Sequence, residues 1–271
     1  MNAALRVGSV PYLVGRPLDC GLENESGIDF VRAVPAKLVR ALREGELDVA
    51  LVSSIELFRR PGYRYLDEIA VAGHGYVASV QVFLRKPLEE VRTLALDPSS
   101  RTARTLVQTL LADRPGGPPH FLEPASGQDP RELDADAWLR IGDEALRELH
   151  AGSHPHFNPS ERWTQTTGLP FVFATWIVRP GVDIEPYAGA FLRARARGKD
   201  SLLKLADEAA AAWELPVEAC REYLRDECHY EPGDQLRPAL EAFGKAAGQI
   251  GLTDTSCNPQ PLRLPSDSVS G

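Results

Sequence analysis

Short apolar runs alternate with helix-spaced stripes of apolar residues along the first 85 positions of the chain. Residues 35–43 form one such stripe, which begins with a proline and ends before Gly45, and this spacing predicts a helix. The strand-like runs around it lie at residues 6–10, 30–34, 48–52, 69–73 and 79–84. Because strands separated by short helices are typical of βαβ units, the pattern predicts a mostly parallel sheet.

A second cycle of the same kind follows, and then the pattern becomes helical. Strands are predicted at residues 93–96, 120–122, 138–141 and 171–178, and helices at residues 101–112 and 142–149. From residue 184 to residue 250, apolar positions recur at helical spacing in three or four pieces, with breaks near Gly198, Pro216 and Pro232. The last 20 residues are rich in Pro and Ser and are predicted to form a frayed tail. The chain is therefore expected to hold two α/β units followed by helices.

Composition narrows the class of protein. The 271 residues carry 38 acidic and 30 basic side chains, and the resulting net charge of −8 argues against a general binder of nucleic acid or anionic membranes. Of the basic residues, 25 are Arg and 5 are Lys. This excess fits either the codon bias of a GC-rich genome or arginines that hold carboxylates in two-pronged hydrogen bonds, and composition does not separate the two.

The N-terminal residues and the cysteines predict a cytoplasmic protein. No long apolar stretch follows a basic head at the start, so no secretory signal is expected. No segment reaches about 18 uninterrupted apolar residues, so no membrane span is expected. Cys20, Cys220, Cys228 and Cys257 form no CxxC pair and are expected to be free thiols rather than disulfide partners or metal ligands.

The loop after the first predicted strand is a candidate binding loop, because ligands in open α/β sheets bind beyond the carboxyl ends of strands. Ser9 and Tyr12 offer hydroxyl groups there, and Arg16 offers a guanidinium group that suits a carboxylate. The alternative is a tight turn bounded by prolines, with Tyr12 packed inward.

Ser53 and Ser54 follow another predicted strand, at residues 48–52. Two hydroxyl groups beside exposed backbone amides would form a small cradle for an anion. Glu56 stands two residues after Ser54 and is either an acid or base for catalysis or a solvated glutamate in the first turn of a helix.

A third candidate lies where the strand at 93–96 gives way to the helix at 101–112. The free amides of a first helical turn form a ready anion site, and hydroxyl and guanidinium side chains would reinforce it. The alternative is an ordinary N-cap. The residues concerned are Asp97-Pro98-Ser99-Ser100-Arg101-Thr102.

Two weaker candidates follow. Asp143 stands at another transition from strand to helix, where it either caps the helix or faces a cleft. Residues 163–176 combine aromatic, hydroxyl and Gly-Pro features that would line a pocket for a ring-sized ligand, or else they form a buried strand with its entry turn.

The histidines at His150, His154 and His156 have a spacing that resembles a metal site. Gly152 and Pro155 interrupt any helix that would bring them to one face, so a metal is not expected. The chain has no GxSxG, P-loop or HExxH motif, and no GxGxxG with an acidic residue after it. The sequence thus gives no support to common hydrolase, kinase or dinucleotide-binding activities.

Several of these segments, taken in order, resemble a known family. Over roughly residues 6–180 the chain is similar to the menaquinone-biosynthesis family of the futalosine route, and more to its chorismate dehydratase branch than to its dihydroxynaphthoate synthase branch. The residues that carry the resemblance are Val10-Pro11-Tyr12-Leu13, Arg16-Pro17-Leu18, Asp48 through Glu56, Ser79-Val80, Ile141-Gly142-Asp143, Ala145-Leu146, Trp163, and Thr167 through Ala174 with Trp176.

The resemblance implies an α/β fold like that of type II periplasmic binding proteins, with two lobes, two crossover strands, a ligand cleft and a C-terminal helical segment. Residues 1–84 plus 179–271 would form the first lobe and residues 85–178 the second. The crossovers would lie at residues 79–85 and 171–179, with a hinge near Arg85 and Arg179.

The resemblance also implies a lyase that removes water from chorismate to give 3-[(1-carboxyvinyl)oxy]benzoate, with no cofactor and no metal. Ser79 matches a serine that the family places in the cleft and would be the catalytic residue. The dicarboxylate substrate would be held at one carboxylate by the helix start at residues 100–102, and at the ring or the other carboxylate by one of the serines at 53 and 54. The substrate-binding residues are expected to be Tyr12, Val14, Arg16, Ser53, Ser54, Ser100, Arg101, Thr102 and Asp143.

The chain departs from the family at Val14, where the family usually has Asn. Because Val cannot hydrogen-bond a leaving hydroxyl or a carboxylate, either Tyr12, Arg16 or Asp143 takes over that contact or activity is reduced. The loop at residues 157–159 also differs from the family's Asp-Leu-Gly.

Two other functions remain open. A dihydroxynaphthoate synthase of the same route would need a histidine in the cleft as its base, and the three histidines lie just outside the matched segments. A carboxylate-binding protein of the same fold would bind without turnover, but a transport protein would be expected to carry a secretion signal. The sequence carries no signal for the oligomeric state.

Overall fold

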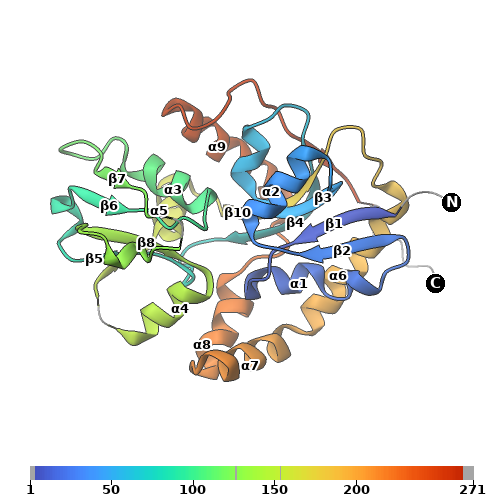
Figure 1. The fold of residues 1–271 in the computed structure, drawn as a ribbon, viewed down its shortest axis with the longest axis horizontal. Coiled ribbons are helices and arrows are strands. Elements are labelled where there is room, and N and C mark those ends of the chain that lie inside the picture. The colour runs from blue at the N-terminus through green and yellow to red at the C-terminus, as the bar shows by residue number, and fades with distance from the viewer. Residues whose placement is uncertain (1–3, 126, 153, 265–271) are drawn as a thin grey trace.

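The computed structural model describes residues 4–125, 127–152 and 154–264. In these residues the strands form two sheets that lie side by side, each with helices packed around it (Figure 1). This is the α/β architecture in two parts that the sequence predicts.

The first sheet has the strand order β11-β4-β10-β3-β1-β2 over the described residues. Its strands are β1 (Leu5–Ser9), β2 (Ile28–Arg32), β3 (Val49–Ser53), β4 (Arg64–Gly73), β10 (Phe171–Val178) and β11 (Gln260–Leu262). The α-helices of this half are α1 (Arg16–Asp19), α2 (Pro35–Glu44), α6 (Ala188–Asp200), α7 (Leu202–Trp213), α8 (Val217–Glu222) and α9 (Leu236–Gln249). Short helical turns that shape the site are η1 (Leu13–Gly15), η3 (Ser54–Phe58) and the π-helical η7 (Tyr223–Glu227).

The second sheet has the order β7-β6-β8-β5-β9 over the described residues. Its strands are β5 (Val80–Leu84), β6 (Thr93–Ala95), β7 (His120–Leu122), β8 (Ala137–Ile141) and β9 (His156–Phe157). The helices of this half are α3 (Thr102–Leu111), α4 (Gly142–Ala151) and α5 (Pro159–Thr167).

The predicted mostly parallel strand direction is confirmed, with one reversed strand in each described sheet that the sequence does not predict. In the described residues both sheets are mixed: β10 runs antiparallel to β3 and β4, and β5 runs antiparallel to β8 and β9. The remaining pairings are parallel. The antiparallel strands are those that the chain enters as it passes from one sheet to the other, so no βαβ crossover fixes their direction.

Most predicted elements are confirmed within a residue or two. The predicted helix at 35–43 is α2, which buries Leu38, Val39 and Leu42 and ends at Gly45 in the left-handed conformation, with φ 79°. The predicted helix at 101–112 corresponds to α3, and the predicted strand at 171–178 is β10. Regular apolar spacing identifies these elements because each of them buries one face or both.

Other elements differ from prediction. Part of the predicted tail forms β11, which pairs in parallel with β4, and residues 265–271 lie outside the described residues. The helix α5 was not predicted, because its Thr-rich sequence has low helix propensity. It is held at its start by the Asn158 side chain, which accepts a hydrogen bond from the amide of Glu161 at 2.9 Å.

The chain passes from the first sheet to the second between Gly73 and Val80, and it returns between Phe157 and Phe171. Sheet membership therefore groups β5 with the second half and β10 with the first, whereas the predicted lobes group them the other way. Hydrogen bonding between strands decides this grouping. How the halves divide as moving units, and a hinge near Arg85 and Arg179, stay predictions.

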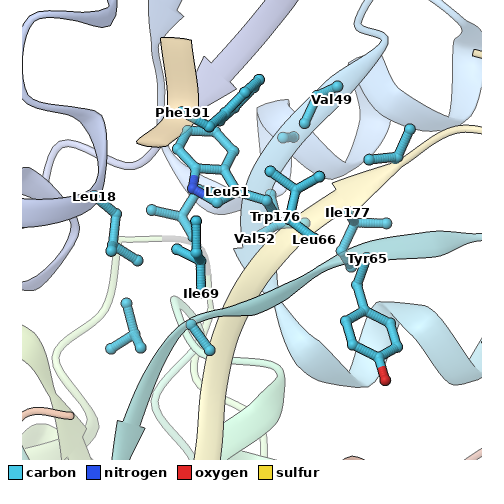
Figure 2. Close-up of a cluster of buried hydrophobic side chains, with 14 of the residues drawn as sticks. Leu18, Val49, Leu51, Val52, Tyr65, Leu66, Ile69, Trp176, Ile177 and Phe191 are labelled. Atoms are coloured by element: carbon cyan, nitrogen blue, oxygen red, sulfur yellow. The ribbon is translucent and has the colours of Figure 1, made fainter. Parts of the chain in front are cut away.

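The core of the first half lies around β3 and β10 (Figure 2). Trp176 on β10 is fully buried and meets Phe191 of α6 edge-on, with ring centroids 5.1 Å apart. Leu51 and Val52 on β3 are also fully buried. Because β3 and β10 are buried on both faces, the edge where β3 ends and β10 begins is closely packed. In the part of the chain that the structure describes, no helix is long and apolar enough to cross a membrane.

Candidate functional site

A cavity of about 90 Å³ lies between the two sheets. Its wall is formed by the ends of β1 and β3, by parts of β4 and β10, and on the other side by β5 and the starts of α3 and α4. The cavity thus takes side chains from both halves of the molecule. The predicted site residues that line it are Tyr12, Val14, Ser53, Ser79, Ser100 and Thr102.

The other predicted site residues do not line this cavity. Arg16 is exposed at the start of α1. Ser54 is fully buried, and its hydroxyl donates to the carbonyl of Val172 at 2.6 Å, so it joins η3 to β10. Arg101 lines a neighbouring pocket instead. Of the three residues expected to replace the family's Asn contact at Val14, only Tyr12 reaches the cavity wall.

The start of α3 is both a helix cap and part of the cavity wall. The Ser100 hydroxyl accepts a hydrogen bond from the amide of Ala103 at 3.0 Å. The Thr102 hydroxyl accepts one from the amide of Ile55 at 3.3 Å, which joins the second half of the molecule to η3 of the first. Both side chains are buried. The sequence leaves open whether these residues cap the helix or bind a ligand. Ser100 caps α3 and also lines the cavity, because the capped end of the helix faces it.

Asp143 makes a second connection between the halves. From the first turn of α4 its carboxylate accepts a hydrogen bond from the backbone amide of Leu13 in η1. Burial raises the pKa of Asp143 to about 6, against smaller opposing contributions from Arg147 and from this hydrogen bond. The side chain therefore faces the other half of the molecule rather than capping its own helix.

Ser79 lies in the passage between the sheets, and its hydroxyl is hydrogen-bonded to that of Tyr223. Tyr223 is buried, lines the same cavity and is also hydrogen-bonded to Cys228. Burial raises the pKa of Tyr223 well above its usual value, so the phenol stays neutral and keeps a proton to donate. The candidate catalytic serine is thus held from behind by a neutral hydroxyl group.

The backbone next to Ser79 is fixed by a glutamate. The amide of Ala78 donates to the Glu227 carboxylate at 2.6 Å. Burial raises the pKa of Glu227 to about 7. Both Tyr223 and Glu227 belong to η7, a π-helical turn, and such turns are frequent at functional sites.

A wider pocket of about 800 Å³ adjoins the cavity. Tyr12, Pro35 and Ser99 line both, so the two form one continuous space. The cationic residues of the outer pocket are Arg59, which follows η3, and Arg101 and Arg104 at the start of α3. We call this space the outer pocket.

Some candidate residues serve the fold instead. Glu56 is fully buried and accepts two hydrogen bonds from Arg43, each at 2.6 Å, so it is not solvated. In the aromatic segment at 163–176, Phe173 and Ala174 line the cavity, whereas Trp163 and Trp176 pack in the hydrophobic core.

The histidine spacing does not build a metal site. The helix α4 ends at Ala151 with Gly152 at φ 66°, which confirms the predicted break. His154 packs edge-on against Trp138, with ring centroids 4.8 Å apart. Within the described residues no group of three or more His, Cys, Asp or Glu side chains is arranged to hold a metal ion. The four cysteines are free.

The sequence model of one family, described as menaquinone biosynthesis, matches residues 5–249. The chain belongs to the menaquinone biosynthesis family.

Two relatives resemble the chain over almost its whole length. One is a protein of Thermus thermophilus named chorismate dehydratase, which is 30% identical over 263 residues, covering 88% of this chain and 96% of that protein. The other is a protein of Campylobacter jejuni with the same name, which is 26% identical over 242 residues, covering 89% of this chain and 92% of that protein.

Solved structures agree with this assignment at the level of the fold. Protein AF1704 from Archaeoglobus fulgidus superposes with a TM-score of 0.75 at 17% identity, covering 92% of this chain and 98% of the other. The alkanesulfonate-binding protein SsuA from Xanthomonas axonopodis pv. citri, bound to MOPS, superposes with a TM-score of 0.66 at 16% identity, covering 97% and 99%. These likenesses establish the periplasmic-binding-protein fold for this member of the menaquinone biosynthesis family.

The cavity of this family member includes residues that sequence reasoning missed. Tyr223 and Cys228 come from a region whose pattern indicates only helices, about 140 residues after Ser79. Arg59 stands five residues after Ser54 with no motif around it. No local signal marks these side chains, because folding alone brings Tyr223 and Cys228 to the cavity and Arg59 to the outer pocket.

Proposed function

We propose that the protein is a chorismate dehydratase: a lyase that converts chorismate to 3-[(1-carboxyvinyl)oxy]benzoate and water. The single observation that carries this proposal is its match, over 88% of the chain, to a relative named chorismate dehydratase. The cavity is consistent with it, since hydroxyl groups and the start of a helix suit a small dicarboxylate. The futalosine route and a cytoplasmic location belong to the same proposal and rest on the sequence resemblance.

The reaction removes a proton from the ring carbon that bears the enolpyruvyl ether, and hydroxide leaves from the neighbouring carbon. The two combine as water, and the ring becomes aromatic. Because aromatisation favours the product, orienting the substrate and excluding water would supply much of the catalysis without a cofactor.

The substrate itself supplies the base in this proposal. Among the described residues that line the cavity there is no histidine, aspartate or glutamate. The enolpyruvyl carboxylate of chorismate would take the ring proton, and Ser79 would orient that carboxylate while Tyr223 holds Ser79 in place. The absence of a histidine in this wall also favours the dehydratase over the dihydroxynaphthoate synthase, which would need one as its base.

Incubation of the purified protein with chorismate, followed by ultraviolet absorbance and mass spectrometry, tests the proposal. Loss of 18 mass units with appearance of an aromatic benzoate is the expected result. Tight binding of chorismate without any loss of water would instead identify a carboxylate-binding protein and overturn the proposal.

A further inference from the structure

Among the described residues, the outer pocket is lined by two guanidinium groups that form no ion pair, while the one carboxylate in its lining, Glu123, is paired with Arg104. Arg59 belongs to the first half of the molecule and Arg101 to the second, and both line the outer pocket. Neither forms an ion pair or a side-chain hydrogen bond with another described residue. Elsewhere many arginines are paired, such as Arg43 with Glu56 and Arg140 with Glu148.

Arg59 is the more unusual of the two. Its Nε atom is buried and has no hydrogen-bond partner among the described residues. A buried donor without an acceptor destabilises a protein, so its presence calls for an acceptor that binds there. Burial lowers the pKa of Arg59, and the positive charge of Arg101 lowers it further against an opposing contribution from Glu56, as expected for two cations that face one another across the junction.

The geometry places these cations at the open end of the cavity. Tyr12, Pro35 and Ser99 line both spaces, so a single small molecule can extend from the cavity into the outer pocket. The cavity wall is mostly apolar, as at Val10 and Phe173. Among the described residues it also carries hydroxyl groups, but it carries no cation. A ring therefore suits the cavity, and a charged group suits the outer pocket.

We propose that Arg59 and Arg101 form a carboxylate subsite that holds one carboxylate of a dianionic ligand across the junction of the two halves. This deepens the proposed function and rests on it: the subsite selects ligands with a carboxylate outside the ring cavity as well as one within reach of the start of α3. A protein with a net charge of −8 needs such a local positive region to attract a dianion.

Calorimetric binding of two stable ligands tests the subsite without requiring turnover. The dianion 3-(carboxymethoxy)benzoate carries a ring, an ether and a second carboxylate, and the monoanion 3-methoxybenzoate lacks that second carboxylate. Arg59→Gln and Arg101→Gln are each expected to weaken binding of the dianion about tenfold or more, as for loss of a charge-assisted hydrogen bond, and to leave binding of the monoanion within about twofold.

Arg60→Gln is the matched control. Arg60 is the next residue after Arg59, and its side chain is exposed, so the substitution removes the same charge outside the outer pocket. It is expected to change neither affinity. Arg59→Lys, which keeps the charge, is expected to recover part of the affinity for the dianion. Equal losses for both ligands, or an equal effect of Arg60→Gln, would overturn the subsite.

Thermal unfolding of the ligand-free variants separates a binding role from a structural one. Arg59→Gln removes a buried unpaired donor and a repulsion from Arg101, so its melting temperature is expected to equal or exceed that of the wild type. A clear decrease would mark Arg59 as a structural residue and contradict the subsite.

The outcome for the subsite is distinguishable from the outcome for the proposed function. If the dianion shows the expected pattern but chorismate is not dehydrated, the subsite stands and the dehydratase is wrong. If Arg59→Gln and Arg101→Gln dehydrate chorismate with unchanged KM, the dehydratase stands and the subsite is wrong.

Discussion

At the scale of single residues, the candidate site is a set of hydroxyl groups whose partners come from distant parts of the chain. Ser79 is hydrogen-bonded to Tyr223, and Thr102 to the amide of Ile55. Each of these contacts joins segments that lie far apart in the sequence. A change at one such residue therefore tests both its chemistry and the arrangement around it.

Ser79→Ala is expected to lower kcat for chorismate by about 10- to 100-fold, because it removes one hydrogen bond to a charged group worth about 1.5–3 kcal/mol. Ser160→Ala is the control, since Ser160 is a buried serine on α5 that does not line the cavity. Steady-state kinetics and melting temperatures of both variants check the prediction. Near-normal turnover of Ser79→Ala in a folded protein would exclude its catalytic role.

Tyr223→Phe is expected to lower kcat about tenfold and to leave KM within about twofold, because it removes the hydroxyl that positions Ser79 and adds no charge. The loss should vanish in a Ser79→Ala background, where nothing remains to be positioned. Tyr65→Phe, a change at an equally buried tyrosine on β4, serves as the control. Additive losses in the double variant would contradict a positioning role.

At the scale of elements, close contacts fix how the C-terminal helices sit on the first half. The helix α6 crosses α1 at Gly198, where an added Cβ would lie 1.8 Å from the carbonyl oxygen of Pro17. This approach requires glycine, because the obstacle is backbone and cannot rotate away. The turn η7 is likewise tied to the passage between the sheets through Glu227 and Ala78.

Gly198→Ala is expected to lower the free energy of unfolding by about 3 kcal/mol, since overpacking against a backbone forces the helices apart. Gly189→Ala on the same helix is the matched control, because its Cβ would meet only the flexible end of Arg193 at 3.1 Å. That change should stay within about 1 kcal/mol of the wild type. Urea unfolding of both variants measures the difference, and similar values would show that α6 can shift without loss.

Glu227 makes part of the stability depend on pH. Its pKa of about 7 in the folded protein lies above the ordinary value of 4.5, so the folded state binds the proton more tightly. The stabilisation is fully present below about pH 4.5 and is lost as the pH rises through 7. The melting temperature of Glu227→Gln should therefore fall less between pH 5 and pH 7.5 than that of the wild type.

Glu214→Gln provides the control for this pH profile, because Glu214 is an exposed carboxylate whose charge does not contribute to the pKa shift of Glu227. Its profile should follow that of the wild type. If Glu227→Gln also follows the wild type, the raised pKa that burial gives Glu227 is wrong.

At the scale of the whole molecule, the cavity takes its wall from both sheets and from η7. Hydrogen bonds from Ile55 to Thr102 and from Leu13 to Asp143 already join the halves around it. A ligand in the cavity contacts both halves at once, so its binding energy stabilises the molecule as a unit.

Scanning calorimetry with 3-(carboxymethoxy)benzoate at about 100 times its Kd is expected to stabilise the protein by about 2.7 kcal/mol in one cooperative transition. A single peak should move to higher temperature, and 3-methoxybenzoate at the same concentration should move it less. Two peaks of which only one moves would show that the ligand binds to one half alone.

The sequence by itself determined which segments form regular structure and which loops face the ligand. Apolar spacing predicts α2, α3 and β10 because each buries a face, and strand ends predict Tyr12, Ser53 and Ser100 at the cavity because strands of a sheet end at a common edge. Spacing along the chain does not report strand direction, so the antiparallel β5 and β10 were missed.

Only the tertiary structure decided which side chains meet in the cavity. Tyr223 reaches Ser79 through the return of the C-terminal helices, and Arg59 faces Arg101 through the packing of η3 beside α3. These contacts depend on how the halves pack in three dimensions. The same packing leaves Arg16 exposed and pairs Glu56 with Arg43, although the sequence marks both as candidates. Local sequence sets the elements, whereas long-range packing sets the partners of each polar group and hence its chemistry.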